Sequence, residues 1–372
     1  MKGIKKKKIC FFIPSLGGGG AERATVNLAN SLSDHFDVDL VISNGNEGYI
    51  EEVNTRVNVI DFNSKKLRYS LFKLIAYLRA NKPHSLISVL TSANVLAILA
   101  RFFSMQQIKL IISERAAIGE ALTNNASWQA RLNLLFIRFL YGYADKIVTV
   151  SMGIAKELVE KFSIKKKKIE VIYNPVVDQS LIEKSLLPLN NPFFDHKKIP
   201  MILGIGRLTE QKDFPTLIKA FNLLRDHENA KLVILGEGHL LNSLQSLVKD
   251  LSIENHVFFP GFVENPFVWM KNAKLFVLSS AYEGLPNALI QAMACGTQVI
   301  STNCPTGPQE ILENGKWGDL VPIGDDKALS SAMLKALKRE NHINVNERAN
   351  FFNVTKATNS YIKLINISKE NQ

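Results

Sequence analysis

The chain has 372 residues, of which 46% are hydrophobic and 21% charged; this is a globular composition with ample core, and the length suggests two domains. A net charge of +11 and a pI near 9.4 suit phosphorylated ligands, an anionic membrane surface or nucleic acid. Three cysteines without CxxC spacing argue against a disulfide framework and a zinc site, and no two of the seven histidines pair on one helix.

Strand-like and helix-like segments alternate through the first half of the chain. Strands are predicted at 9–14, 38–43, 57–61, 86–90, 108–112, 146–150 and 169–173. Helices are predicted at 21–33, 66–80, 95–103, 128–143 and 154–162. Such repeated βα units predict a parallel, doubly wound sheet with helices on both faces.

A linker is predicted at 176–198, where prolines interrupt the periodic pattern. The alternation then restarts, with strands predicted at 201–205, 232–235, 257–259, 275–278 and 298–301. Helices are predicted at 214–225, 240–251, 266–272, 286–294, 327–338 and 355–367. The expected fold class is therefore α/β, with two Rossmann-like domains facing each other across a cleft and a ligand held at the switch points of both sheets.

Neither a secretory signal nor a membrane span is expected. The apolar stretch 9–16 contains Pro14 and runs into four glycines, and the stretch 86–103 is interrupted by polar residues. Lysines cluster at 5–8 and 165–168, without aromatic residues between them or a nucleic-acid motif. The aromatic helix 128–143 is interpreted mainly as core, although one basic and aromatic face of it also suits anionic lipid.

The strongest candidate site lies in the run 279–296. Glu283 follows the apolar strand 275–278 and precedes a helix that Pro286 is placed to open and Gly296 to end. Ligands bind at the carboxyl ends of strands in open α/β sheets, and a helix N-terminus favours an anion. A carboxylate there indicates a ligand with hydroxyls beside phosphates. An ordinary crossover with an exposed Glu explains this stretch alone equally well.

A second candidate is the loop 206–213, which carries Arg207 and Lys212 between a strand and a helix. Together these cations are suited to neutralise a diphosphate as it leaves, and the alternative is a solvated surface pair. The four glycines 17–20 follow the first strand but match neither a Walker loop nor a dinucleotide fingerprint. Asp37 and Asp39 offer an acid pair, but apolar residues alternate with them as at the start of a strand.

Several motifs are specific in combination. They are Gly17-Gly18-Gly19-Gly20-Ala21-Glu22-Arg23, Tyr173-Asn174-Pro175, Gly206-Arg207-Leu208 with Lys212, Gly236-Glu237-Gly238, Pro260-Gly261-Phe262, and the run EGLPNALIQAMACG from Glu283 to Gly296. With them the chain resembles the GT-B glycosyltransferases of family 4, the "group 1" retaining transferases, over essentially its whole length.

The resemblance implies transfer of a sugar from a nucleotide diphosphate sugar with retained configuration, without a cofactor or catalytic metal. It implies catalytic roles for Glu283, Arg207 and Lys212: the two cations hold the diphosphate, and the carboxylate contacts the sugar hydroxyls. Backbone near Phe262 would contact the base. Further implied donor-binding residues are Gly18, Gly19, Gly284, Leu285, Asn287, Ala288 and Gln291, and the acceptor-side candidates are Glu22, Arg23 and Arg115.

Two departures from the family pattern stand out. Gln291 occupies the position where a second Glu commonly binds the ribose diol, so a neutral hydrogen bond of about 1 kcal/mol replaces a charge-assisted one of about 1.5–3 kcal/mol. Arg115 stands where many relatives carry a His after Ser-Glu, and an arginine cannot serve as a base. No general base is therefore named, and the leaving diphosphate is expected to take the acceptor proton.

We therefore expect an acceptor domain at 1–175, completed by a C-terminal helix within 355–372, and a donor domain at 199–354. The expected protein is a cytoplasmic glycosyltransferase, peripheral on the inner membrane, which uses a UDP-hexose or UDP-N-acetylhexosamine. Its expected acceptor is a lipid-linked oligosaccharide or a surface polysaccharide such as lipopolysaccharide, and no nucleic-acid partner is expected. The alternatives are a GT-B sugar-nucleotide epimerase and a non-catalytic sugar-nucleotide-binding or scaffolding subunit.

Overall fold

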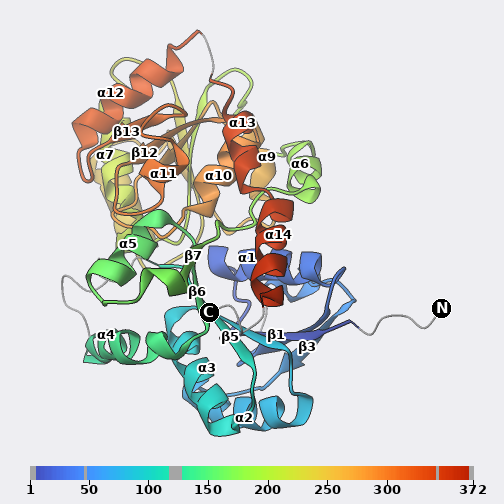
Figure 1. The fold of residues 1–372 in the computed structure, drawn as a ribbon. Helices are drawn as coiled ribbons and strands as arrows, with labels where there is room; N and C mark the ends of the chain where they lie inside the picture. Colours follow the sequence, from blue (N-terminus) through green and yellow to red (C-terminus); the bar gives the residue numbers. More distant parts are fainter. Residues whose placement is uncertain (1–5, 46–47, 117–127, 341–342, 368–372) are drawn as a thin grey trace. The chain divides into compact units, whose positions relative to one another are not determined.

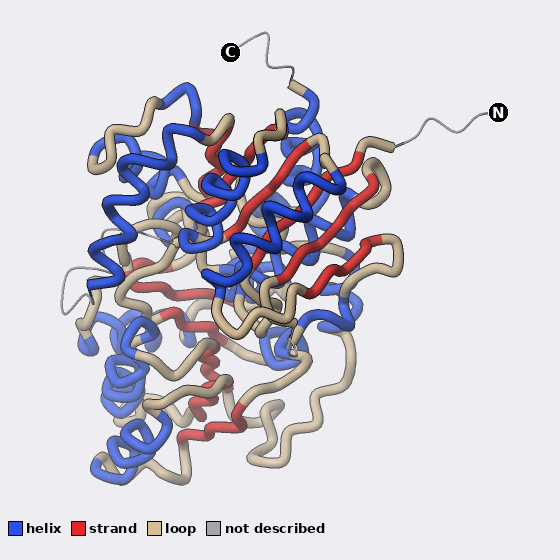
Figure 2. Tube along the Cα trace, turned by 90° about the horizontal axis from the view of Figure 1, so that it is seen from below, coloured by secondary structure: helices blue, strands red, loops and turns tan. Residues whose placement is uncertain are grey.

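The computed structural model describes residues 6–45, 48–116, 128–340 and 343–367. The chain divides into two compact units, one formed by Met1–Pro175 with Val354–Gln372 and the other by Val176–Asn353. Each unit has its own parallel sheet with helices packed on it (Figures 1 and 2). The fold class predicted from the alternating pattern, α/β with two parallel sheets, is confirmed.

The first unit contains a seven-stranded parallel sheet in the order β3-β2-β1-β4-β5-β6-β7. Its strands are β1 (Lys8–Ile13), β2 (Asp37–Ile42), β3 (Val57–Asp61), β4 (Ser85–Val89), β5 (Lys109–Glu114), β6 (Lys146–Thr149) and β7 (Ile169–Val171). Its helices are α1 (Gly20–Leu32), α2 (Ser70–Asn81), α3 (Thr91–Ser104), α4 (Trp128–Leu140), α5 (Met152–Glu160) and α14 (Val354–Asn366). Short 3-10 turns are η1 (Tyr49–Glu52), η2 (Leu67–Tyr69), η4 (Tyr141–Tyr143) and η5 (Lys166–Lys168).

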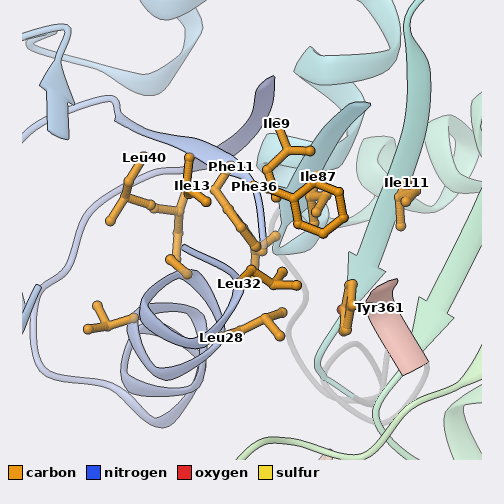
Figure 3. Packing of buried hydrophobic residues seen from close by; sticks show 14 of the residues in the cluster. Ile9, Phe11, Ile13, Leu28, Leu32, Phe36, Leu40, Ile87, Ile111 and Tyr361 are labelled. Atoms are coloured by element: carbon orange, nitrogen blue, oxygen red, sulfur yellow. The ribbon is translucent and has the colours of Figure 1, made fainter. Parts of the chain in front are cut away.

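The core of this unit forms where α1 and α14 pack on one face of the sheet. Ile9, Phe11 and Ile13 of β1 meet Leu28 and Leu32 of α1, and all five are buried (Figure 3). Figure 3 also shows Tyr361 of α14 in the same cluster, although this helix comes from the end of the chain. Strands buried on both faces read as continuous apolar runs, which is why the sequence reveals them so clearly.

The second unit contains a six-stranded parallel sheet in the order β10-β9-β8-β11-β12-β13. Its strands are β8 (Met201–Ile205), β9 (Lys231–Leu235), β10 (Val257–Gly261), β11 (Leu275–Leu278), β12 (Gln298–Thr302) and β13 (Asp319–Val321). Its helices are α6 (Gln179–Ser185), α7 (Phe214–Leu224), α8 (Leu241–Asp250), α9 (Pro266–Asn272), α10 (Asn287–Ala294), α11 (Pro308–Ile311), α12 (Asp326–Leu337) and α13 (Val345–Ala349). The 3-10 turns are η6 (Glu210–Lys212) and η7 (Asn350–Phe352).

The main differences from the predicted elements are short segments. The predicted linker 176–198 belongs to the second unit and contains α6, which starts because the Asp178 side chain accepts a hydrogen bond from the Leu181 N–H at 2.8 Å. Strand β13 and helices α11 and α13 were not predicted, because three to five residues are too few to show a periodic pattern.

Each sheet has one point where the strand order reverses direction. In the first unit this switch lies between β1 and β4, and in the second it lies between β8 and β11. Loops at the carboxyl ends of strands flanking such a switch diverge and leave room for a ligand. In the second unit the loops that follow β8 and β11 are therefore the expected positions of a ligand-binding site.

Candidate active site

The two loops at the second switch carry the charged residues that the sequence singled out. Arg207 and Lys212 lie in the loop after β8, and Glu283 lies in the loop after β11. The Lys212 Nζ is 2.5 Å from the Glu283 Oε1, and these side chains are 17% and 8% exposed. Residues 71 positions apart thus form a largely buried ion pair at the switch.

Hydroxyl groups hold this ion pair in place. The Ser280 Oγ donates to the Glu283 Oε1 at 2.7 Å, and the Ser279 Oγ donates to the Lys212 carbonyl oxygen at 2.7 Å. The Thr306 Oγ1, from the loop after β12, donates to the Glu283 carbonyl oxygen. Ser280 and Thr306 did not emerge from the sequence reasoning. The signal for Ser280 was its place in the pair of serines that follows β11, whereas Thr306 lies four residues after the end of β12.

Backbone contacts join the same loops. The Ala281 N–H donates to the Gln211 carbonyl at 2.8 Å, and the Gln211 Nε2 donates to the Tyr282 carbonyl at 3.0 Å. The positions of Lys212 and Glu283 are therefore fixed by their neighbours as well as by their own charges. A site held in this way is preorganised, so little ordering remains to be done when a ligand binds.

Two positions near the ion pair require glycine, because atoms of a neighbouring loop lie too close for a Cβ. Gly236, after β9, packs on the loop after β8, and a Cβ built on it would lie 2.0 Å from the Gly206 carbonyl oxygen. Gly307 has φ +87°, and a Cβ there would lie 2.6 Å from the Pro286 Cδ. The loops after β9 and β12 thus pack directly on the two loops that carry the ion pair.

The other predicted donor-side residues surround these loops. Arg207 is exposed, and within the described part of the chain it forms no ion pair, whereas Gly284 and Leu285 are buried beside Glu283. Asn287 and Ala288 are the first two residues of α10, at the positive end of the helix dipole. Gln291 is half-buried one turn further along. Phe262 follows β10 and its side chain is 60% exposed.

Cys304, in the loop after β12, is a thiol on which the charges of this ion pair act. Burial, with the Glu283 charge as a smaller contribution, raises the pKa of the Cys304 thiol to about 12, so the thiol stays protonated. Among the residues that the structure describes, no three His, Cys, Asp or Glu side chains converge where a metal ion would sit. The chemistry available is that of two cations, one carboxylate, hydroxyls and backbone N–H groups.

The glycine loop of the first unit lies at the other switch. Gly18 has φ +88° and is exposed, and nothing lies within 4 Å of a Cβ built on it. A Cβ on Gly19 would lie 2.3 Å from the Glu22 Oε2, so this carboxylate folds back over the start of α1. Arg23 points elsewhere: its Nη2 pairs with the Glu52 Oε1 at 3.1 Å, and its guanidinium lies over the Tyr49 ring.

Arg115, the third acceptor-side candidate, is buried. It is 8% exposed, its Nη1 donates to the Asn174 Oδ1 at 2.7 Å, and it also hydrogen-bonds with Tyr361 of α14. Asn174 lies directly before the point where the chain leaves the first unit, and α14 is the helix that re-enters it. Arg115 therefore ties together the two segments at which the chain crosses between units.

A second buried network beside Arg115 did not emerge from the sequence reasoning. Glu114 is fully buried at the end of β5, accepting hydrogen bonds from the Tyr141 hydroxyl at 2.6 Å and the Thr91 hydroxyl at 2.9 Å. Burial raises the pKa of the Glu114 carboxyl above its ordinary value. The Asn94 Nδ2 donates to the same tyrosine at 3.2 Å.

With respect to membranes, none of the helices in the described residues combines the length and the apolar character needed to cross a bilayer.

Comparison with known families matches the chain in two parts. Residues 18–179 match "Glycosyltransferase Family 4", and residues 191–353 match "Glycosyl transferases group 1". The boundary between the two matches falls near the boundary between the two structural units.

Two similar relatives come from Campylobacter jejuni. One is the N-acetylgalactosamine-N,N'-diacetylbacillosaminyl-diphospho-undecaprenol 4-alpha-N-acetylgalactosaminyltransferase, 30% identical over 343 residues, which cover 89% of this chain and 90% of the relative. The other is the GalNAc-alpha-(1->4)-GalNAc-alpha-(1->3)-diNAcBac-PP-undecaprenol alpha-1,4-N-acetyl-D-galactosaminyltransferase, 29% identical over 376 residues, which cover 96% of this chain and 98% of the relative.

Among solved structures, Anabaena HepE in complex with UDP and glucose superposes with a TM-score of 0.79 at 19% identity, covering 96% of this chain and 99% of HepE. At this identity the likeness concerns the fold. Both family matches and the 30% identical relative lead to one conclusion: the chain belongs to glycosyltransferase family 4, the group 1 glycosyltransferases, and is a glycosyltransferase with the GT-B fold.

Proposed function

We propose that this glycosyltransferase moves a hexose or N-acetylhexosamine from a UDP-sugar, with retained configuration, onto a lipid-linked glycan at the cytoplasmic face of the inner membrane. The observation that carries the donor half is the Lys212–Glu283 ion pair at the switch between β8 and β11. It combines a cation for phosphate with a carboxylate for sugar hydroxyls, and Arg207 lies on the same loop as the cation.

In the proposed complex, Arg207 and Lys212 bind the diphosphate, and the N–H groups that open α10 add to the positive field. Glu283, released from Lys212, accepts hydrogen bonds from the donor sugar. As the bond between the sugar carbon and the diphosphate oxygen breaks, the two cations stabilise the charge that develops on the leaving group. The acceptor hydroxyl forms the new bond on the same face and gives its proton to the departing diphosphate.

Two findings support the choice of donor and acceptor. The names of both Campylobacter jejuni relatives describe transfer of N-acetylgalactosamine to undecaprenyl-linked glycans. HepE, which shares the fold, was solved with UDP and glucose. In the first unit, Gly18, Gly19 and Glu22 lie at the carboxyl end of β1, and we assign the acceptor to this edge of the sheet. The roles of Arg23 and Arg115 are then structural.

The donor half is tested by thermal shift with UDP, GDP and their sugars. A nucleotide that binds only the folded protein at 100 times its Kd adds about 2.7 kcal/mol to stability. We expect UDP to raise the melting temperature more than GDP does, and Arg207→Ala to lose that response while keeping its own melting temperature.

Catalysis is tested by UDP release from a UDP-hexosamine with and without a polyprenyl-diphosphate-linked acceptor. We expect release to depend on the acceptor and to be lost in Arg207→Ala. Binding of UDP without turnover on any lipid-linked glycan would instead favour a non-catalytic subunit. An Arg207→Ala protein with full turnover would refute the proposed mechanism.

A further inference from the structure

One surface of the first unit combines large exposed apolar side chains with exposed lysines. We call it the α3–η5 surface. Its apolar members are Phe102 (72% exposed), Phe103 (51%), Met105 (87%), Leu135 (52%), Phe139 (66%) and Tyr143 (67%). Its basic members are Lys165, Lys166, Lys167 and Lys168. Single exposed apolar residues need no explanation, but six of them on adjoining elements indicate an interaction surface.

Hydrogen bonds and helix contacts show that these elements adjoin. Helix α3 packs against α4 and η4, and α3 and α4 are neighbours in Figure 1. The Arg101 Nη1, at the end of α3, pairs with the Asp145 Oδ2 at 2.6 Å, just after η4. The Lys168 Nζ in η5 donates to the carbonyl oxygens of Gly142 and Ala144, the latter at 2.9 Å. The apolar residues and the lysines therefore belong to one continuous surface.

The apolar residues point away from the core by helical spacing. Leu135, Phe139 and Tyr143 lie four residues apart and form an outward stripe along α4 and η4, whereas Ile137 between them is buried. The stripe leads to the end of α3, where the rings of Phe102 and Phe103 lie edge to face at 5.3 Å. In a parallel sheet this is the edge where strands begin, so the carboxyl edge with the glycine loop stays accessible.

Two acids described near this surface pair with basic residues outside its lysine cluster. Asp145 is paired with Arg101, and the Glu170 Oε1 is paired with the Lys146 Nζ at 3.0 Å. Lys165 and Lys166 are exposed, and so is the neighbouring Lys167. The surface therefore complements an anionic partner. Leu135, Phe139 and Met105 would find no apolar counterpart on the phosphodiester backbone of a nucleic acid, whereas a bilayer offers phosphate beside hydrocarbon.

We propose that the α3–η5 surface docks the enzyme on an anionic lipid bilayer. Phe102, Phe103 and Met105 enter the boundary between headgroups and acyl chains, and Lys165, Lys166 and Lys167 contact lipid phosphates. The inference deepens the proposed function, because a lipid-linked acceptor requires an enzyme that works at the membrane. The sequence suggested lipid contact for the helix 128–143 alone, whereas the proposed surface is built from α3, α4, η4 and η5.

The test is co-sedimentation of the full chain with vesicles of phosphatidylglycerol and phosphatidylcholine, compared with phosphatidylcholine alone. We expect binding only to the anionic vesicles, and a steep loss of binding in 1 M salt, where the Debye length falls to about 3 Å. The triple variant Lys165→Gln, Lys166→Gln, Lys167→Gln is expected to bind about 100-fold more weakly, since each lysine near an anionic surface contributes about fivefold. Lys168 is kept because it bonds to the carbonyls of η4.

A second variant tests the apolar part. Phe102→Ser, Phe103→Ser, Met105→Asn is expected to lose about tenfold or more in vesicle binding. Asparagine suits the left-handed backbone of Met105, which has φ +56°. Matched controls lie on the second unit: the triple change Lys197→Gln, Lys198→Gln, Lys316→Gln, and the pair Leu186→Ser, Leu187→Ser, all at exposed positions.

Both surface variants are expected to keep the melting temperature rise that UDP produces, which separates docking from the donor site. Wild type that ignores anionic vesicles while responding to UDP would overturn this inference alone. Controls that lose as much vesicle binding as the surface variants would also overturn it. Vesicle binding without any nucleotide response would leave docking in place and count against the proposed function.

Discussion

Replacing Glu283 by Gln is expected to strengthen UDP binding while slowing sugar transfer. In the structure the Lys212 Nζ lies 2.5 Å from the Glu283 Oε1, and the two side chains are only 17% and 8% exposed. In the proposed complex the diphosphate needs the same ammonium group. The carboxylate therefore competes with the nucleotide for Lys212, and removing its charge releases the lysine.

The size of the effect follows from the kind of hydrogen bond that is lost. A hydrogen bond with a charged partner contributes about 1.5–3 kcal/mol, and a neutral one about 1 kcal/mol. Gln keeps the shape and the Ser280 contact but lacks the charge, so Lys212 is held less tightly by roughly 1 kcal/mol, which corresponds to about a fivefold lower Kd for UDP. Turnover is expected to fall at least about tenfold, because the sugar hydroxyls lose a charged acceptor.

Calorimetric titration with UDP measures the first effect, and UDP release from a UDP-hexosamine measures the second. Glu254→Gln, the same change at an exposed turn of the same unit, is the matched control and is expected to alter neither. The reasoning is refuted if Glu283→Gln binds UDP more weakly than wild type does.

The complementary change, Lys212→Met, is expected to weaken UDP binding and to destabilise the fold. Removing one partner of a buried pair costs up to about 3–5 kcal/mol, and the lower end applies here because the Ser280 hydroxyl still contacts the carboxylate. Combining Lys212→Met with Glu283→Gln is expected to restore much of that stability, as measured by denaturant unfolding.

Three further predictions concern Gln291, Arg115 and Glu114. Gln291→Glu is expected to lower the Kd for UDP by about fivefold by adding a charged acceptor for the ribose, and to give no gain with 2′,3′-dideoxyuridine diphosphate. Arg115→Met is expected to lower the unfolding free energy by about 1.5–3 kcal/mol through loss of its bond to Asn174, with UDP affinity unchanged. The fold raises the pKa of the Glu114 carboxyl above its ordinary value of 4.5. Glu114 therefore contributes fully to the unfolding free energy below pH 4.5, and this contribution is lost as pH rises through the raised pKa. Glu114→Gln should therefore gain unfolding free energy relative to wild type from acid to neutral pH, and a pH-independent difference would contradict this.

The sequence was sufficient to predict that Arg207, Lys212 and Glu283 lie in loops after strand ends. Each sheet strand is a continuous apolar run because it is buried on both faces. The sequence therefore shows where each strand ends, and it places Arg207 and Glu283 after strand ends. The contact between Lys212 and Glu283 could not be predicted from the sequence. It depends on β8 lying beside β11, and strand order is a property of the folded sheet.

Two acceptor-side candidates, which the family resemblance implied, have structural partners that the sequence does not reveal. The sequence analysis treats Arg23 and Arg115 as groups that face a ligand. In the structure Arg23 forms an ion pair with Glu52. Arg115 is buried against Asn174 and Tyr361. These partners lie between 29 and 246 positions from the arginines in the sequence, and no local sequence pattern predicts them. An arginine after a strand end is thus ambiguous until the segments that cross between units are in place.

The ion pair at the switch also bears on how the proposed reaction would proceed to completion. While a UDP-sugar is bound, the sugar hydroxyls satisfy Glu283 and the diphosphate satisfies Lys212, so neither charge is left buried alone. After transfer the sugar departs, and Glu283 is left without a charged partner while Lys212 still holds UDP. A buried carboxylate without a partner is unfavourable, so recapture of Lys212 by Glu283 favours release of UDP. The same contact that opposes nucleotide binding by about fivefold would then promote turnover by expelling the product.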